Sequence, residues 1–401
     1  MSPRFSPICL TQYTATTCLG LGKAPLRAAL AEGRSGLAPC AFETVQLATW
    51  VGAVEGVDAA ALPAHLAAYN CRNNRLALLG LEADGFGDAV RAAIARYGKR
   101  RIGVFLATST SGILETEIAY RHRDPQSGAL PGDYRYAETH NTYSVAAFTR
   151  DYFGLEGPTV VVSTACSSSA KVFASAQRML ACGLIDAAVV GGIDSLCLTT
   201  LYGFNSLELL SDQPCRPYDA ERKGISLGEG AAFALLERDN ASQPDASVWL
   251  LGYGESSDAY HMSAPHPEGR GAQAAMQAAL AMAGVTADAV DYINLHGTAT
   301  PSNDAAEGHA VAAVVGKRVP CSSTKGATGH TLGAAGAVEA IISALAIEDG
   351  LMPGSCHTGE LDPSIAIDYV LSPRQARLRR VLSNSFGFGG SNCSLLLGVL
   401  P

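Results

Sequence analysis

Short, almost continuously apolar segments alternate along most of this chain with segments in which apolar residues recur at helical spacing. Four segments of the first half favour strands: 102–108, 159–165, 186–193 and 231–238. The helical segments between them, such as 89–98 and 168–183, stop at glycine. Strands that are apolar at nearly every position are typical of sheets buried on both faces. The chain is therefore predicted to have an α/β fold.

The second half repeats this pattern. It favours two further strands and two further helices, the strands at 247–254 and 290–297 and the helices at 269–284 and 339–350. Segments 160–183 and 319–350 each combine a β-rich entry, a turn of small residues and a long helix. Two halves of related topology would place these turns face to face. We assign the halves to 1–245 and 246–401, with a polar, proline-containing hinge at 238–247.

The charge content limits the kinds of partner. Only 16% of the 401 residues are charged, against a typical value of about 25%. Fewer charges mean less surface to solvate, which favours a large interior or a sizeable subunit interface. The net charge of −8 argues against general nucleic-acid binding, which needs a basic excess.

The sequence shows no targeting or membrane segment. The 11 cysteines include neither a CxxC redox pair nor a zinc ribbon. The start of the chain lacks a charged region followed by an apolar one. No apolar run approaches the roughly 20 residues of a membrane span. We expect a reduced, cytoplasmic protein with no membrane span.

Three motifs suggest other chemistries, and none has the context it needs. The GISLG run at 224–228 would make Ser226 a hydrolase nucleophile, but a charged turn precedes it and a strand follows it. LGLGK near residue 20 lacks the first glycine and the Ser/Thr of a phosphate loop. Cys166, His296 and His330 have the right side chains for a metal, but no short chelating motif starts a site. No metal is expected.

The strongest constellation joins two histidines, a loop and a cysteine. His296 in INLHGTATPSND and His330 in SSTKGATGHTLGAAG both fall where sheet ends meet loops, a usual place for chemistry. Small residues around them would let a narrow substrate approach the backbone. The glycine-rich loop 383–392, SNSFGFGGSN, carries N–H groups that could face an oxyanion. The segment STACSSSA alone does not decide whether Cys166 is a small buried side chain or a nucleophile.

These pieces resemble the β-ketoacyl–acyl-carrier-protein synthases, condensing enzymes of the thiolase-fold superfamily. The matching segments, in the family's order, are STACSSSA, RPYDAERKGISLGEGA, DAYHMSAP, NLHGTATPSND, SSTKGATGHTLGAAGAVE and SNSFGFGGSN. The resemblance covers essentially the whole chain. It implies a thiolase-like, five-layered αβαβα fold of two similar halves that works as a dimer.

The resemblance also implies roles for five residues. Cys166 would be the nucleophile that accepts the acyl group, with His296 and His330 as the paired histidines. Lys325 and Glu339 would support the site. Cys166 is expected at the start of a helix, whose partial positive charge favours the thiolate.

Three further residues match family positions around the substrate. Thr298 and Thr300 match residues that hydrogen-bond the phosphopantetheine arm. Phe388 matches the gating phenylalanine, whose N–H joins that of Cys166 as the oxyanion hole. The resemblance implies no metal or redox cofactor, because the substrates are carried on phosphopantetheine.

The implied reaction is a decarboxylative condensation of malonyl carrier protein with an acyl group on Cys166. The alternative is a non-catalytic chain-length-factor-like subunit, which typically lacks the cysteine, so Cys166 and both histidines favour an enzyme. The segment YINLHGTATPSNDAAEG looks closest to ketosynthases of bacterial aryl-polyene clusters. The segment 108–117 differs from the glycine-rich version that normally lines the acyl pocket.

The expected partners follow from the same resemblance. An acyl carrier protein is acidic, so this acidic chain needs a local basic patch to bind it. Arg72 and Arg75 lie three residues apart in a predicted helix, on one face, and are the candidates for docking. The second subunit is expected to be a copy of the chain or a chain-length-factor-like paralogue.

Overall fold

The computed structural model describes residues 6–238 and 248–400. The predicted hinge at 238–247 lies outside these ranges except for its first residue. The boundary between residues 245 and 246 also lies outside them, so the division into halves stays a prediction. Within the described residues, no helix has the length and apolar character needed to cross a bilayer.

Five strands from the first part of the chain form one end of the main sheet: β1 (Ile8–Thr17), β4 (Ile102–Ala107), β5 (Thr159–Val162), β6 (Ala187–Asp194) and β8 (Gly230–Glu237). Their spatial order is β1-β8-β6-β4-β5. The apolar runs predicted as strands are all present. β4, β6 and β8 are buried along their whole length, which confirms that helices cover both faces.

The strands of the second part repeat this order: β9 (Trp249–Ser257), β10 (Tyr292–Asn294), β11 (Pro320–Ser322), β15 (Arg380–Gly387) and β16 (Ser391–Gly398). They run β9-β16-β15-β10-β11, with β13 (Asp368–Tyr369) beyond β11. The corresponding neighbours are parallel or antiparallel in the same sequence. The repeat recognised in the sequence is therefore a repeat of topology.

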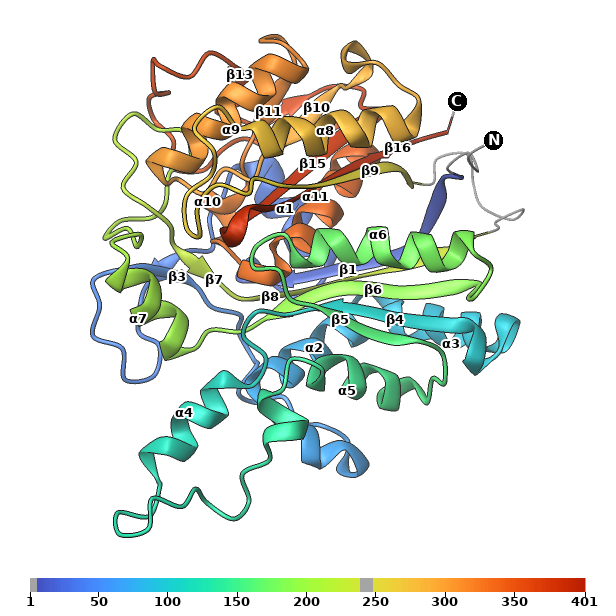
Figure 1. Ribbon diagram of the computed structural model, residues 1–401, viewed down its shortest axis with the longest axis vertical. Helices are drawn as coiled ribbons and strands as arrows, with labels where there is room; N and C mark the ends of the chain where they lie inside the picture. Colours follow the sequence, from blue (N-terminus) through green and yellow to red (C-terminus); the bar gives the residue numbers. More distant parts are fainter. Residues whose placement is uncertain (1–5, 239–247, 401) are drawn as a thin grey trace.

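The two sets of strands are joined. β1 pairs with β9 through Ile8–Leu250 and Cys9–Trp249, so the main sheet has 11 strands. Edge strands carry unpaired N–H and C=O groups, and this contact satisfies some of them. The sheet turns back at this join, and its two ends stack with helices between them (Figure 1).

Three layers of helices pack on the sheet: one lies between its two ends, and one covers the outer face of each end (Figure 1). The central layer contains α1 (Lys23–Glu32), α6 (Ser168–Ala181) and α11 (Ala335–Asp349). One outer layer contains α2 (Arg72–Glu82), α3 (Phe86–Tyr97) and α5 (Ser144–Phe153), and the other α8 (Arg270–Ala283) and α9 (Pro301–Val314). The predicted five-layered αβαβα fold is confirmed.

Shorter elements complete the chain. The helices α4 (Ile113–Arg121), α7 (Leu198–Ser206) and α10 (Lys325–Thr328) lie near the strand ends. Two small sheets are formed by β2 (Ala38–Pro39), β3 (Trp50–Gly52) and β7 (Leu227–Gly228), and by β12 (Leu351–Met352) and β14 (Arg374–Gln375). β8 follows the GISLG run, and Ser226 is fully buried, so the interpretation that this run is not a nucleophile turn is confirmed.

The two central helices pack closely. Every residue of α11 from Ala335 to Ile347 is buried, as expected of a helix that is apolar on all sides. A Cβ on Gly336 would lie only 2.6 Å from the backbone nitrogen of Ala170 in α6. Glycine is required there because the two backbones leave no room for a side chain.

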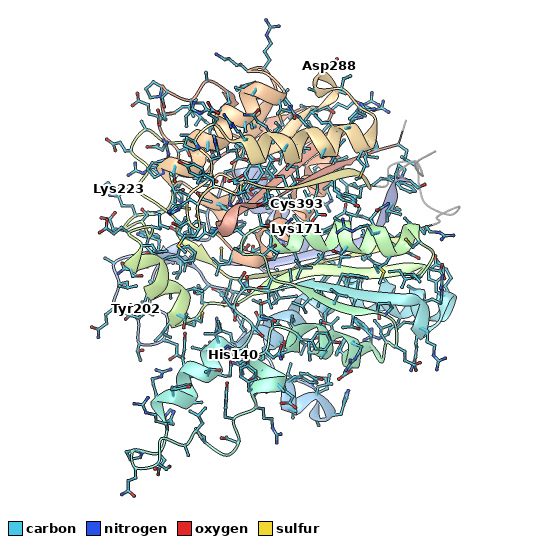
Figure 2. The ribbon with its side chains drawn as sticks, viewed as in Figure 1. His140, Lys171, Tyr202, Lys223, Asp288 and Cys393 are labelled. Carbon is cyan, nitrogen blue, oxygen red and sulfur yellow. The ribbon has the colours of Figure 1, made fainter. Side chains whose placement is uncertain are left out.

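Polar contacts also connect the central layer to the sheet. The Lys171 ammonium of α6 lies 3.2 Å from Glu255 of β9, close to Cys393 of β16 (Figure 2). The backbone N–H of Ala337 in α11 donates to the Ser169 hydroxyl of α6 at 2.8 Å. The first contact ties α6 to the sheet, and the second holds the starts of α6 and α11 together.

Candidate active site

Cys166 lies in the turn from β5 to the N-terminus of α6, as the sequence predicted. Ala165 has a φ of 54°, a left-handed conformation that costs energy for a residue other than glycine. The backbone N–H of Thr164 donates to the Ser168 hydroxyl at 2.7 Å, which holds the turn. The turn directs the thiol toward the second half of the chain.

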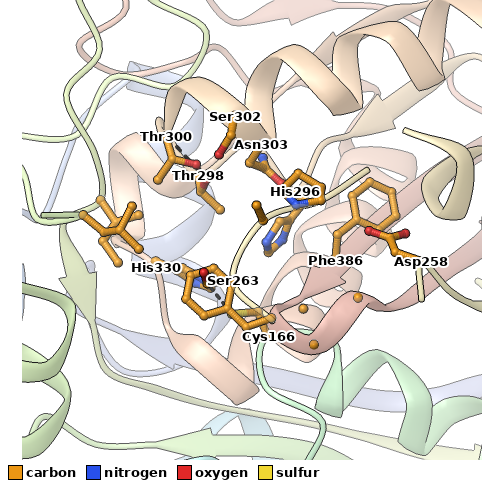
Figure 3. Close-up of a pocket in the computed structure, with 18 of the residues that line it drawn as sticks. Cys166, Asp258, Ser263, His296, Thr298, Thr300, Ser302, Asn303, His330 and Phe386 are labelled. Atoms are coloured by element: carbon orange, nitrogen blue, oxygen red, sulfur yellow. Dashed lines mark hydrogen bonds between the residues drawn. The ribbon is translucent and has the colours of Figure 1, made fainter. Parts of the chain in front are cut away.

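His330 lies in the equivalent turn before α11 and meets the cysteine. Its Nε2 is 3.0 Å from the Cys166 sulfur (Figure 3). The backbone N–H of Leu332 donates to His330 Nδ1 at 3.2 Å. Since Nδ1 accepts this hydrogen bond, the neutral ring carries its proton on Nε2, facing the sulfur.

His296 follows β10 and completes the group. The two imidazole rings meet edge to face, with centroids 5.4 Å apart and an angle of 84°. The Lys325 ammonium lies 3.4 Å from His296 Nδ1. An ammonium can only donate, so His296 also carries its proton on Nε2.

A buried ion pair supports His296. Lys325 and Glu339, which the family resemblance implied would support the site, are 1% and 3% exposed and form a salt bridge. Lys325 also donates to the His296 carbonyl oxygen. Burial raises the pKa of Glu339 to about 7, and the Lys325 charge opposes that rise. Burial, reinforced by Lys325, holds the pKa of both histidines well below the usual value, so both rings are neutral.

The resting state of Cys166 differs from the expectation. Burial raises the pKa of the Cys166 thiol to about 12, while Lys325 and a hydrogen bond from the Phe388 N–H oppose the rise. The favourable effect expected from the start of the helix is outweighed, because the loss of solvent exceeds the favourable charges. The cysteine rests as a thiol.

This pKa predicts a pH dependence for alkylation. The rate constant for iodoacetamide labelling of Cys166 should rise about tenfold per pH unit from pH 6 to pH 9, because only the thiolate reacts. Peptide mapping by mass spectrometry follows Cys166 separately from the exposed Cys182. A plateau of the Cys166 rate below pH 8 would contradict a raised pKa.

A small apolar cavity opens from the three side chains. It encloses about 50 Å³ and is lined by Cys166, His296, His330, Phe386 and Phe388. A liquid water molecule takes up about 30 Å³, so a long acyl chain needs side chains to move. Thr298 and Thr300 line the same cavity, with their hydroxyl oxygens 2.9 Å apart.

The loop around Phe388 is partly exposed and rich in glycine. Phe388 is 36% exposed and its ring centroid lies 5.8 Å from that of Phe204 on α7. Gly389 and Gly390 follow with φ values of 81° and 74°, a region that favours glycine. This placement fits the predicted gate.

Among residues 6–238 and 248–400, these three side chains also form the one group of His, Cys, Asp or Glu whose geometry could hold a metal ion. Their ligand atoms lie within 4.8 Å of one another, and a thiolate with two imidazoles suits zinc. However, the 3.0 Å from His330 Nε2 to the Cys166 sulfur is a hydrogen-bond distance, below the roughly 3.5 Å between ligands of a tetrahedral zinc. Lys325 next to His296 adds positive charge where a cation would sit. The arrangement fits hydrogen-bond donors better than metal ligands.

The predicted docking pair lies elsewhere. Arg72 and Arg75 occupy one face of α2, as expected, and both approach Asp58. Arg72 is only 4% exposed and forms two hydrogen bonds, of 2.6 and 2.9 Å, to the fully buried Glu229. The prediction that Arg72 docks a carrier protein is wrong, because its charge is already used inside the fold. Arg75 has a side chain that is 18% exposed and stays a prediction.

Two buried carboxylates near the site were missed in the sequence. Glu307 accepts the backbone N–H groups of His296 and Gly297 at 2.9 and 2.8 Å. Asp194 accepts the N–H of Gly333, close to His330. The sequence offers a weak signal for Asp194, since it ends an apolar strand at the same sheet edge as the site.

Comparisons with known proteins agree with this geometry. Two family models match, described as "Beta-ketoacyl synthase, N-terminal domain" over residues 86–242 and "Beta-ketoacyl synthase, C-terminal domain" over residues 248–359. The chain belongs to the β-ketoacyl synthase family. This β-ketoacyl synthase fold and the close Cys-His-His group match what the sequence predicted.

This β-ketoacyl synthase is similar to two curated relatives and to one solved structure. The chain is 46% identical over 260 residues to 3-oxoacyl-[acyl-carrier-protein] synthase 2 of Rhizobium meliloti, covering 61% of each protein. It is 35% identical to Nodulation protein E of the same species, over 74% of this chain and 75% of that one. The match to the synthase thus spans about three fifths of its length.

The solved structure is similar over its full length. It is described as a ketosynthase (ApeO) in complex with its chain length factor (ApeC) from Xenorhabdus doucetiae. The TM-score is 0.89, with 38% sequence identity and 100% coverage of both chains. The likeness therefore includes every layer of the fold.

Proposed function

We propose that this protein is a 3-oxoacyl-[acyl-carrier-protein] synthase that extends an acyl chain on Cys166 by two carbons. The observation that carries the proposal is the pair of neutral imidazoles, each with its Nε2 proton available, next to the Cys166 thiol in one apolar cavity. One site thus offers a nucleophile and two donors for a developing negative charge. The similarity to synthases and a ketosynthase supports the same reaction.

The first half-reaction transfers the acyl group. The Cys166 sulfur attacks the thioester carbonyl of an acyl carrier protein, a carbon–sulfur bond forms, and the carrier leaves as a thiol with the Cys166 proton. The Phe388 N–H already points at the sulfur, and with the Cys166 N–H it would hold the oxyanion. His330 Nε2–H stabilises the sulfur as it becomes a thiolate.

The second half-reaction forms the carbon–carbon bond. Malonyl carrier protein loses CO₂, and the electron pair of the broken bond forms an enolate whose oxygen accepts hydrogen bonds from His296 and His330. The enolate carbon then attacks the acyl carbonyl, the Cys166 thiolate leaves, and it regains its proton from solvent. Each bond change is balanced without a metal or redox cofactor, because both substrates arrive as thioesters.

The rim of the cavity suits the arm that carries the substrates. Thr298 and Thr300 place two hydroxyls beside His296 and are proposed to bind the phosphopantetheine amides. Phe388 and its glycines are proposed to open for the acyl chain, because the cavity of about 50 Å³ is too small for one.

His330→Ala tests the two half-reactions. The variant should lose malonyl decarboxylation by about 10²- to 10³-fold, the usual effect of removing one oxyanion donor. Acylation of Cys166 should fall less, since the thiol and the Phe388 N–H remain. Carbon dioxide release from malonyl carrier protein and the mass of the acylated Cys166 peptide report the two steps separately. Equal loss of both steps would contradict the division of roles.

A chain-length-factor role is not favoured, because the complete Cys-His-His group is present. We propose instead that the protein pairs with such a subunit or with its own copy. β5 ends the sheet order and carries four half-buried residues, Thr159–Val162, so its outer edge is open for pairing. The similar ketosynthase in complex with its chain length factor supports a heterodimer. Mass measurement of the protein alone and co-expressed with a chain-length factor distinguishes the two assemblies.

An acyl carrier protein as the donor, the aryl-polyene pathway and a cytoplasmic location remain predictions. Mass spectrometry of the acyl chains found on Cys166 in the purified protein addresses the pathway directly. Long conjugated chains would support the aryl-polyene placement, and short saturated chains would support fatty-acid synthesis.

A further inference from the structure

Asp194, at the end of β6, is a buried carboxylate that forms no salt bridge with any residue of 6–238 or 248–400. It is fully buried, and one of its oxygens accepts four hydrogen bonds of 2.7 to 2.8 Å from the turn after β4. The donors are the hydroxyls of Thr108 and Thr110 and the backbone N–H groups of Ser109 and Thr110. All of these groups donate and thus favour the ionised carboxylate, although burial raises the pKa of Asp194. Burying a carboxylate in this way needs a reason beyond packing.

The other oxygen of Asp194 reaches across to the second half of the chain. It accepts the backbone N–H of Gly333 at 2.5 Å. Gly333 follows Leu332, whose own N–H donates to His330 Nδ1. Asp194 is therefore connected through two consecutive peptide units to the hydrogen bond that places the His330 proton on Nε2.

The turn at Leu332 needs this external support. Leu332 has a φ of 52°, a strained conformation for a side chain of this size. A Cβ on Gly333 would lie 2.6 Å from the Ser109 hydroxyl and 2.8 Å from Asp194, so the turn is pressed against the carboxylate. Gly333 also lies just before α11, where a negative charge is stabilised by the helix N-terminus.

We propose that Asp194 is a positioning residue that keeps His330 in the tautomer with its proton on Nε2. Its charge holds Gly333 and thereby aims the Leu332 N–H at Nδ1. This inference rests on the proposed function, because the Nε2 proton matters for donating to an enolate. Without the carboxylate, the Leu332 turn relaxes, the Nδ1 acceptor loses its donor and the two tautomers become comparable in energy.

Two variants disturb the same contact from opposite ends. Asp194→Asn keeps the shape of the side chain but presents an amide N–H₂ either to Gly333 or to the four donors of the β4 turn. Gly333→Ala keeps the carboxylate but pushes the turn away from it. Glu237→Gln is the matched control, since Glu237 is a buried carboxylate at the other end of the β6–β8 pair, bound to Arg96.

The readout is the tautomer of His330, observed by NMR in protein with ¹⁵N-labelled histidine. The wild-type protein should show a protonated Nε2 and an unprotonated Nδ1, and His330→Ala assigns the signals. Asp194→Asn and Gly333→Ala should both gain a second population with Nδ1 protonated, while Glu237→Gln should not. Malonyl decarboxylation should fall in proportion to the lost population with Nε2 protonated, by about twofold when the two tautomers are equally populated, and acylation of Cys166 should fall less.

Two outcomes overturn the inference. One is a wild-type His330 with its proton on Nδ1, a result that needs no variant to fold. The other is an unchanged His330 tautomer in a folded Asp194→Asn or Gly333→Ala protein. The NMR reading needs no substrate, so it stands apart from the proposed function. A protein that condenses nothing but shows the tautomer shift would disprove the function and retain the positioning role.

Discussion

Cys166→Ala should lower the rate of condensation by roughly 10⁵-fold or more, comparable to the loss of a nucleophile in other covalent enzymes. Among the described residues, Cys166 is the one cysteine whose sulfur forms a group with His296 and His330 in which all ligand atoms lie within 4.8 Å of one another. In the proposed mechanism, the acyl-enzyme can no longer form, so the two-step route is closed. Formation of the 3-oxoacyl product from acyl and malonyl carrier proteins measures the loss.

The same variant should retain decarboxylation of malonyl carrier protein within about tenfold of the wild-type rate. Both imidazole donors remain, and alanine leaves the cavity slightly larger. Cys182→Ala, which removes an exposed thiol remote from the histidines, is the control and should change neither activity. Loss of decarboxylation together with condensation would show that the sulfur takes part in both steps.

Lys325→Met should lower the free energy of unfolding by about 3–5 kcal/mol, because it leaves Glu339 buried without its cation. It should also lower decarboxylation, since His296 Nδ1 loses the donor that keeps its proton on Nε2. Chemical denaturation at one fixed protein concentration measures the first effect, and carbon dioxide release measures the second.

The pH dependence of that loss has a defined sign. Lys325 lowers the pKa of Glu339, so its removal raises that pKa above about 7 in the folded protein. Between the unfolded and folded pKa values, the folded state binds a proton that the unfolded state does not, and stability falls as pH rises. The Lys325→Met protein should therefore be less stable at pH 8 than at pH 6.

A double variant separates stability from activity. Lys325→Met with Glu339→Leu replaces the whole ion pair by apolar side chains of similar size, which is often neutral or stabilising. Stability should return to near the wild-type value and lose its dependence on pH between 6 and 8, while decarboxylation stays low. If decarboxylation recovered together with stability, the Lys325–Glu339 ion pair would have only a structural role.

Much of the fold was predictable because strands buried on both faces of a sheet are apolar at nearly every position. The apolar runs that became β4, β6 and β8 could be recognised directly, since each position along them is buried. The encounter of Cys166 with His330 followed from the repeated strand–turn–helix pattern. A repeat in sequence implies equivalent turns, and equivalent turns of stacked halves meet.

The features that were missed depend on contacts between distant residues. The burial of Arg72 follows from its pairing with Glu229, which lies 157 residues away in sequence. The raised pKa of Cys166 follows from how deeply the second half covers the thiol. No local pattern reports either fact, because both depend on which surfaces the fold brings together.

The contact between α6 and α11 has a consequence for how the enzyme can evolve. The backbone of Gly336 in α11 lies directly against Ala170 of α6. The contact between these two backbones therefore fixes the distance between the Cys166 sulfur and the His330 imidazole. Interiors packed in this way are nearly incompressible. We therefore expect changes in substrate preference to arise at Phe388 to Gly390 and among the other residues that line the pocket. The contact between Gly336 and Ala170 can accept almost no substitution, because a larger side chain would clash there.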